Sequence, residues 1–292
     1  FDGIRAMREW YEAGVLGQVT EVHSGFPGPR WNGKYFKMPE KMPPAKQPVP
    51  DNLNWDLWVG SAVKYDYNSI FHRRTWRSFW DYGTGELGDW FCHICDGPVW
   101  ILDLYEPNEI DCLKREENME GIVTSSSVVR WKFPKRGDKA ACDLYWADGG
   151  NPIKTPEEWG YGKDPITGSN WFAEKNNAWL DERSNNPRLA SREKMIEFKK
   201  KGFPEQKYSR LKTRSPHREL MNAIKGGPKP GSSFDYSALL TETCLLGVMA
   251  QRFGGKIKWD AKKMKITNRP ELNEFIKKPI QNGWEDYGTD LW

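Results

Sequence analysis

The residues best suited to chemistry lie in one short stretch, residues 89–96. Asp89 and His93 are four positions apart, so they share a face of a helix, and Asp96 follows His93 near the same stripe. A carboxylate one helical turn from an imidazole can orient the ring and raise its pKa, as general acid–base catalysis requires. The spacing alone equally allows a structural Asp–His pair, or an N-terminal helix cap by Asp89.

The same stretch contains thiols that could suggest other chemistry. Together with Asp89, His93 and Asp96, Cys92 would still not complete a closed ligand set, so we predict no metal. Cys92-His93-Ile94-Cys95 matches C-x-x-C, but a redox pair would follow a thioredoxin-like strand, and no such strand precedes it. We therefore interpret these cysteines as small core thiols.

A glycine-rich stretch, Gly83-Thr84-Gly85-Glu86-Leu87-Gly88, precedes these residues and matches G-x-G-x-x-G. That motif indicates dinucleotide binding only where it follows a buried parallel strand. Residues 73–81 are rich in Arg and aromatic side chains and do not form such a strand. We interpret the glycines as a turn that begins a helix close to a ligand, and we predict no cofactor-binding residue in the chain.

Aromatic side chains and one arginine supply candidate substrate contacts. The chain has 16 Trp, several times the usual share, and indole faces stack well on sugar rings. Arg77 could donate to the hydroxyls or carboxylates of a ligand, or it could form a structural cation–π stack. We predict that the substrate is a carbohydrate and that it is bound by Arg77, Trp80, Tyr82, Asp96 and Trp31.

Composition argues against several other classes of protein. The 44 basic and 40 acidic residues give a net charge of +4, so we expect no nucleic-acid partner. No apolar run approaches the roughly 20 residues needed to span a bilayer. Five cysteines at irregular spacing do not form a disulfide framework. The sequence does not distinguish a cytoplasmic from a periplasmic location.

Hydrophobic periodicity predicts alternating helices and strands. The connections between strands are short, which favours antiparallel pairing and an α+β layer fold. Residues 25–54 contain many prolines and are interpreted as an ordered lid or substrate loop. We expect helices at residues 4–11, 89–104, 191–201, 216–225 and 236–253, and strands at 19–24, 109–114, 125–133, 142–147 and 256–259, with a short strand pair near Trp171.

The order of these motifs resembles the Gfo/Idh/MocA oxidoreductases, in the branch common in Bacteroidetes and Planctomycetes. The most specific match is Gly-Asp-x-x-x-His at Gly88, Asp89 and His93, within residues 81–96. Trp76-Arg77 precedes this block. Further matches lie at residues 54–60, 186–189, 234–236, 239–242, 245–247, 259–260 and 283–284.

The resemblance implies that residues 1–292 are one C-terminal substrate and oligomerisation domain, with residues 1–17 as the remnant of a bridging helix. Its fold would be a large, mostly antiparallel open β-sheet with helices packed on one face. The N-terminal Rossmann domain, which would hold NAD or NADP, would be absent, and the fragment alone would be inactive. A homo-oligomer through the sheet face is also expected.

The implied reaction is hydride transfer between NAD(P) and a carbohydrate or cyclitol hydroxyl. His93 would donate or accept the hydroxyl proton, with Asp89 beside it. Two alternatives stay open: a parent glycosidase that uses NAD through oxidised intermediates, and a stand-alone carbohydrate-binding or assembly module without redox activity.

Overall fold

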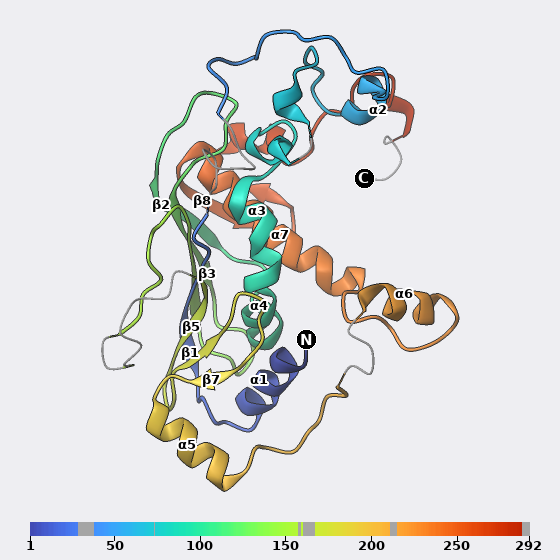
Figure 1. The fold of residues 1–292 in the computed structure, drawn as a ribbon. Coiled ribbons are helices and arrows are strands. Elements are labelled where there is room, and N and C mark those ends of the chain that lie inside the picture. Colours follow the sequence, from blue (N-terminus) through green and yellow to red (C-terminus); the bar gives the residue numbers. More distant parts are fainter. Residues whose placement is uncertain (29–37, 73, 157–158, 160–166, 211–214, 288–292) are drawn as a thin grey trace.

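The computed structural model describes residues 1–28, 38–72, 74–156, 159, 167–210 and 215–287. The described residues form one nine-stranded open sheet with the order β7-β6-β5-β1-β4-β3-β2-β8-β9 (Figure 1). The strands are β1 (Val19–Gly25), β2 (Glu109–Arg115), β3 (Ser127–Phe133), β4 (Cys142–Ala147), β5 (Gly168–Ala173), β6 (Ala178–Leu180), β7 (Arg188–Leu189), β8 (Gly255–Asp260) and β9 (Lys265–Ile266).

The predicted mostly antiparallel open sheet is confirmed. Only β1 and β4 pair in parallel among the described strands, with Val22 opposite Leu144 and His23 opposite Tyr145. This parallel pair was not predicted, because β1 enters the centre of the sheet while its partner lies more than a hundred residues later along the chain. The fold is therefore a mixed α and β domain with one parallel pair.

The helices are α1 (Asp2–Glu12), α2 (Trp55–Val59), α3 (Gly85–Ile94), α4 (Asp96–Leu102), α5 (Arg192–Lys201), α6 (Pro216–Ile224) and α7 (Phe234–Phe253). In Figure 1, α1, α3, α4 and α7 lie along the same side of the sheet, whereas α6 lies at the tip of an arm that continues from α7. The helices that carry the candidate chemistry thus pack close to the sheet.

The single helix expected at residues 89–104 is two helices that meet at Cys95. Pro98 has no N–H and cannot bond the carbonyl of Ile94 as a continuous helix would require. Instead the Ser184 hydroxyl donates to the Ile94 carbonyl at 2.9 Å and accepts from the Gly97 N–H at 3.1 Å. The break is therefore satisfied by a distant side chain, which the local pattern could not reveal.

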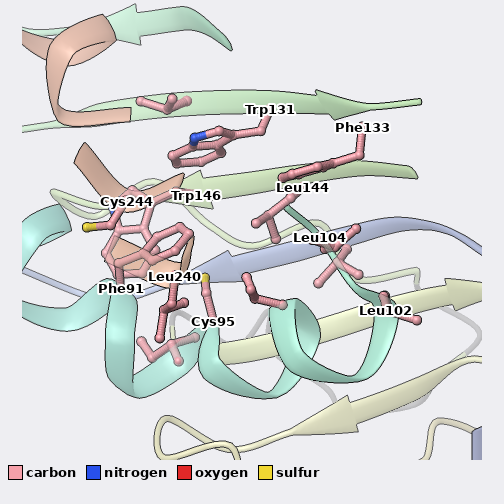
Figure 2. Close-up of a cluster of buried hydrophobic side chains, with 14 of the residues drawn as sticks. Phe91, Cys95, Leu102, Leu104, Trp131, Phe133, Leu144, Trp146, Leu240 and Cys244 are labelled. Atoms are coloured by element: carbon pink, nitrogen blue, oxygen red, sulfur yellow. The ribbon is translucent and has the colours of Figure 1, made fainter. Parts of the chain in front are cut away.

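The main core lies between the sheet and helices α3 and α7. Alternate residues of β3 point inward, and Trp131 is fully buried beside Phe91 of α3 (Figure 2). The Trp131 indole N–H donates to the carbonyl of Thr243 in α7 at 2.8 Å. A buried indole can contribute several kcal/mol through its apolar area, so Trp131 ties the sheet to both helices.

A second core cluster supports the segment that leads into α3. It brings Trp55 and Val59 of α2 together with Tyr67, Phe71, Phe79 and Ile122, all buried. Trp55 stacks on Trp58 with ring centroids 4.7 Å apart. Residues 55–82, where no long helix or strand was expected, are therefore held by aromatic packing.

Asp148 forms a buried polar network at the end of β4. Its carboxylate accepts from the Ser127 N–H at 2.6 Å, the Trp146 indole at 2.9 Å and the Gln251 amide at 3.2 Å. Burial nevertheless raises the pKa of Asp148 to about 6, although these hydrogen bonds favour the ionised form. The network joins β3, β4 and α7 around one titratable group.

We expect the stability of the protein to depend on pH through Asp148. Its pKa is higher in the folded state than in the unfolded chain, so the folded state binds more protons between about pH 4 and pH 6. The contribution of Asp148 to the free energy of unfolding should therefore fall by about 3 kcal/mol as pH rises through this window. Urea unfolding of the wild type and Asp148→Asn at pH 4 and pH 7 measures this difference.

An asparagine at position 148 stays neutral, so the wild-type stability relative to Asp148→Asn should decrease from pH 4 to pH 7. A constant difference between the two proteins over this range would contradict the account.

Candidate functional site

Helix α3 carries the predicted acid–base residues, and glycines let it begin where it does. A Cβ atom on Gly83 would lie 2.5 Å from the Arg77 Cα, and Gly85 has a φ of +67° at the start of the helix. The segment before them contains a short 3₁₀ helix, Thr75–Ser78, and one isolated bridge between Phe79 and Ile122. These glycines therefore form a tight turn, and no parallel strand leads into them as dinucleotide binding would require.

Asp89 is held by Arg77. The Arg77 Nε lies 2.9 Å from the Asp89 Oδ1, and the guanidinium also lies 4.4 Å from the Trp76 ring centroid. The cation–π stack considered for Arg77 is thus present, and contact between Arg77 and a ligand stays a prediction. Because both charges are partly exposed, the pair contributes about 0–1 kcal/mol to stability, and its main effect is to fix the position of the Asp89 carboxylate.

His93 lies on the exposed side of α3, and its ring centroid is 5.2 Å from that of Trp90. The pKa of His93 is lowered, first by partial burial of the ring and then by the positive charge of Arg183, while Asp89 and Asp96 oppose the shift. The sequence analysis expected the neighbouring carboxylate to raise this pKa. The structure gives the opposite direction because burial and Arg183 outweigh the carboxylates, so His93 is neutral near pH 7.

Asp96 turns away from this stripe toward α7. The Tyr236 hydroxyl donates to the Asp96 carboxylate, and its oxygen also lies 3.1 Å from the Asp96 carbonyl oxygen. Burial raises the pKa of Asp96, whereas the Tyr236 hydrogen bond and the charge of His93 lower it. Asp96 therefore has a protein partner that a substrate would need to replace or share.

We expect Tyr236→Phe to destabilise the protein by about 1–3 kcal/mol at pH 7, because it removes a donor from a carboxylate in a poorly solvated position. The loss should shrink as pH falls, since a protonated Asp96 no longer carries the charge that the hydroxyl stabilises. Chemical denaturation at two pH values measures both effects.

Tyr105→Phe is the matched control, because the Tyr105 hydroxyl makes no hydrogen bond within the described part of the chain. Equal stability losses for the two variants would contradict the assigned role of Tyr236.

Of the other predicted substrate contacts, two pack into the protein and one is not described. Trp80 is 8% exposed, and the Arg252 guanidinium lies 5.7 Å from its ring. The Tyr82 hydroxyl donates to the Val63 carbonyl at 2.8 Å, within the second core cluster. Trp31 lies outside the described residues. The structure thus brings together Arg77, Asp89 and His93, while Trp80 and Tyr82 contact other parts of the chain.

Trp90 and Arg183 are site residues that the sequence analysis did not select. Trp90 stacks on Phe26 with ring centroids 3.7 Å apart, and the Arg183 guanidinium lies 5.7 Å from the Trp90 centroid. The i, i+3 spacing of Trp90 and His93 could have identified the tryptophan. Nothing in the sequence could have identified Arg183, because it lies in a turn ninety residues after His93.

The thiols of this helix differ in environment. Cys95 is fully buried, whereas Cys92 is exposed and shares a hydrogen bond with Cys244 of α7 that lowers the pKa of the Cys92 thiol. Within the described residues, no three His, Cys, Asp or Glu side chains converge as a metal site. In the same residues, no helix is both long and apolar enough to cross a bilayer.

This geometry defines the class of protein: an α/β domain in which a helix beside an open sheet exposes an Asp and a His on one face. Residues 3–133 match the family model described as the oxidoreductase family, C-terminal alpha/beta domain, of the Gfo/Idh/MocA type. This match confirms, over residues 3–133, the resemblance to that oxidoreductase family found in the sequence.

Among solved structures, the chain is similar to the crystal structure of a candidate dehydrogenase from Bordetella bronchiseptica RB50. The two are 12% identical, with a TM-score of 0.42, over 87% of this chain and 66% of that chain. The chain thus spans a little less than two thirds of that protein's length. No curated protein matches the sequence at a significant level.

Proposed function

We propose that this chain is the substrate-binding domain of an NAD(P)-dependent oxidoreductase that acts on a carbohydrate or cyclitol hydroxyl. The observation that carries the proposal is the exposed His93, which lies one helical turn from an Asp89 fixed by Arg77. The match of residues 3–133 to the C-terminal domain of an oxidoreductase family supports the same class of reaction. An exposed acid–base pair of this kind suits a substrate that is covered on its other side by a second domain.

The residues of this chain would carry out the proton transfer of the reaction. A neutral His93 can accept the proton of the substrate hydroxyl as the carbon loses its hydride, and Asp89 then stabilises the imidazolium. In the reverse direction the imidazolium returns the proton to the new alkoxide. A bound nicotinamide supplies the hydride acceptor or donor, and the described residues offer it no glycine loop after a parallel strand.

The proposal implies that the chain binds its substrate but needs a separate cofactor domain for turnover. The test compares this chain with a longer protein that carries a cofactor domain, using a panel of sugars and both nicotinamides. Reduction of nicotinamide by the longer protein alone supports the proposal. Sugar binding by the chain combined with no nicotinamide binding by the longer protein would instead favour a carbohydrate-binding module.

We further propose that the domain forms a homo-oligomer through the outer face of the sheet. On this face basic and acidic strands alternate: Arg130 of β3 lies opposite Asp111 of β2, and Lys132 opposite Glu109. Ion pairs connect these side chains across the strands, and the side chains of Arg130 and Glu109 are only 21% and 16% exposed. An ordered surface with both signs of charge can pair with a second copy of itself about a two-fold axis.

We expect the chain to sediment as a dimer or larger assembly at physiological salt. Arg130→Glu should weaken the assembly, because it places a like charge beside Asp111 and Glu109. Analytical ultracentrifugation measures both proteins, with Arg218→Glu in α6 as the control. A monomer at all concentrations would contradict an oligomer, and equal dissociation of the two variants would contradict this interface.

A further inference from the structure

A rigid turn carries Arg183 to the edge of the candidate site. The Asp181 carboxylate accepts from the backbone N–H groups of Arg183 at 3.0 Å and Asn185 at 2.8 Å. Ser184 is 1% exposed and bonds both sides of the break between α3 and α4, directly after His93. The position of Arg183 relative to His93 is therefore fixed by the backbone on both sides.

The Arg183 guanidinium has no polar partner in the part of the chain that the structure describes. The side chain is exposed, and among the described residues it contacts the face of Trp90, with the guanidinium 5.7 Å from the ring centroid. Within the described part of the chain it makes no ion pair or hydrogen bond. A cation–π contact uses the face of the guanidinium and leaves its N–H groups available for two-pronged bonding to an anion.

The other charges of the site already have partners. Asp89 is paired with Arg77 at 2.9 Å, and Asp96 accepts the hydroxyl of Tyr236. Arg183 is thus the positive charge near His93 whose side-chain N–H groups have no partner among the described residues. Its effect already reaches the imidazole, since its charge contributes to the lowered pKa of His93.

We propose that Arg183 is the anion-recognition residue of this site, and that the substrate is a sugar derivative carrying a carboxylate or phosphate group. This inference rests on the proposed function and adds the chemical class of the substrate. A guanidinium forms charge-assisted, bidentate bonds with both anionic groups. With the anion on Arg183, a sugar hydroxyl would face His93.

The test titrates this chain with glucose 6-phosphate, glucuronate, glucose and inorganic phosphate while following the imidazole resonances of its four histidines by NMR. His93→Gln assigns the His93 signal. We expect an anionic sugar to shift that signal with an affinity at least about tenfold tighter than that of glucose, which corresponds to about 1.4 kcal/mol. A response to glucose 6-phosphate alone identifies a phosphate substrate, and a response to glucuronate alone identifies a carboxylate.

Arg183→Met should abolish this preference and raise the pKa of His93, because a nearby positive charge is removed. Arg183→Lys should retain part of both effects, and Arg218→Met is the surface control. The inference is overturned if glucose binds as tightly as the anions, if inorganic phosphate binds as tightly as the sugar phosphate, or if Arg183→Met leaves anion affinity unchanged.

Failure of this inference can be told apart from failure of the proposed function. Turnover of neutral sugars that depends on His93 but not on Arg183 would contradict only the proposal that the substrate is anionic. Anions could instead bind through Arg183 while the protein with its cofactor domain shows no hydride transfer. That result would contradict the oxidoreductase proposal and support only the anion-binding site.

Discussion

Replacement of His93 by glutamine is expected to lower kcat of the protein with its cofactor domain by about 10²- to 10⁴-fold, the usual contribution of a positioned general base. Glutamine keeps a similar size and polarity but cannot accept the hydroxyl proton. KM should change little, because His93 is exposed and the remaining substrate contacts are untouched. Steady-state kinetics with the best sugar of the panel measures both parameters.

The pH dependence of the reaction supplies a second readout for His93. Because its pKa is lowered from the ordinary value, the imidazole stays neutral to below about pH 6.5. Sugar oxidation needs the neutral form and should fall as pH drops through this lowered pKa, whereas carbonyl reduction needs the imidazolium and should rise. His217→Gln, an exposed histidine in α6, is the control. Normal turnover by His93→Gln, or an unchanged pH profile, would show that the proton passes elsewhere.

Replacement of Gly247 by alanine is expected to destabilise the fold by about 1–3 kcal/mol or more, the usual cost of overpacking a core. In an exposed helix the same change would stabilise by about 1 kcal/mol. Here a Cβ atom on Gly247 would lie 2.0 Å from Cζ2 of Trp131, which is fully buried and bonded to the carbonyl of Thr243. The indole has no room to move, so the steric clash outweighs the gain in helix propensity and the substitution destabilises the protein.

Thermal or urea unfolding measures this difference in stability. Gly231→Ala is the matched control, because the nearest atom to its Cβ would be 3.6 Å away, at ordinary contact distance. We expect this control to unfold within about 0.5 kcal/mol of the wild type, as is usual for surface substitutions. A Gly247→Ala variant as stable as the wild type would mean that α7 does not pack on Trp131 as closely as described.

Much of the local structure could be predicted because it depends on neighbouring residues. The alternation of β3 fixes which side chains face the core, and the burial of Val129 and Trp131 follows it. Ser191 begins the helix expected at residues 191–201, and it caps α5, since its hydroxyl accepts from the Lys194 N–H at 3.3 Å. These features need only periodicity and capping chemistry.

The features that were not predicted depend on contacts between distant residues. The parallel pairing of β1 with β4 and the helix break filled by Ser184 have no local signal. The direction of the His93 pKa depends on Arg183, which only the folded chain brings near. For the same reason, the sequence could place Asp89 and His93 on one helix face but could not show that Trp80 is buried.

The central claim is that this domain presents a sugar hydroxyl for hydride transfer. The most direct test uses a sugar deuterated at the carbon to be oxidised, together with NAD(P) and the protein with its cofactor domain. The account predicts deuterium in the isolated reduced nicotinamide, and loss of that transfer in His93→Gln. Product formation with the deuterium released to water, or retained on the sugar without cofactor reduction, would contradict the claim.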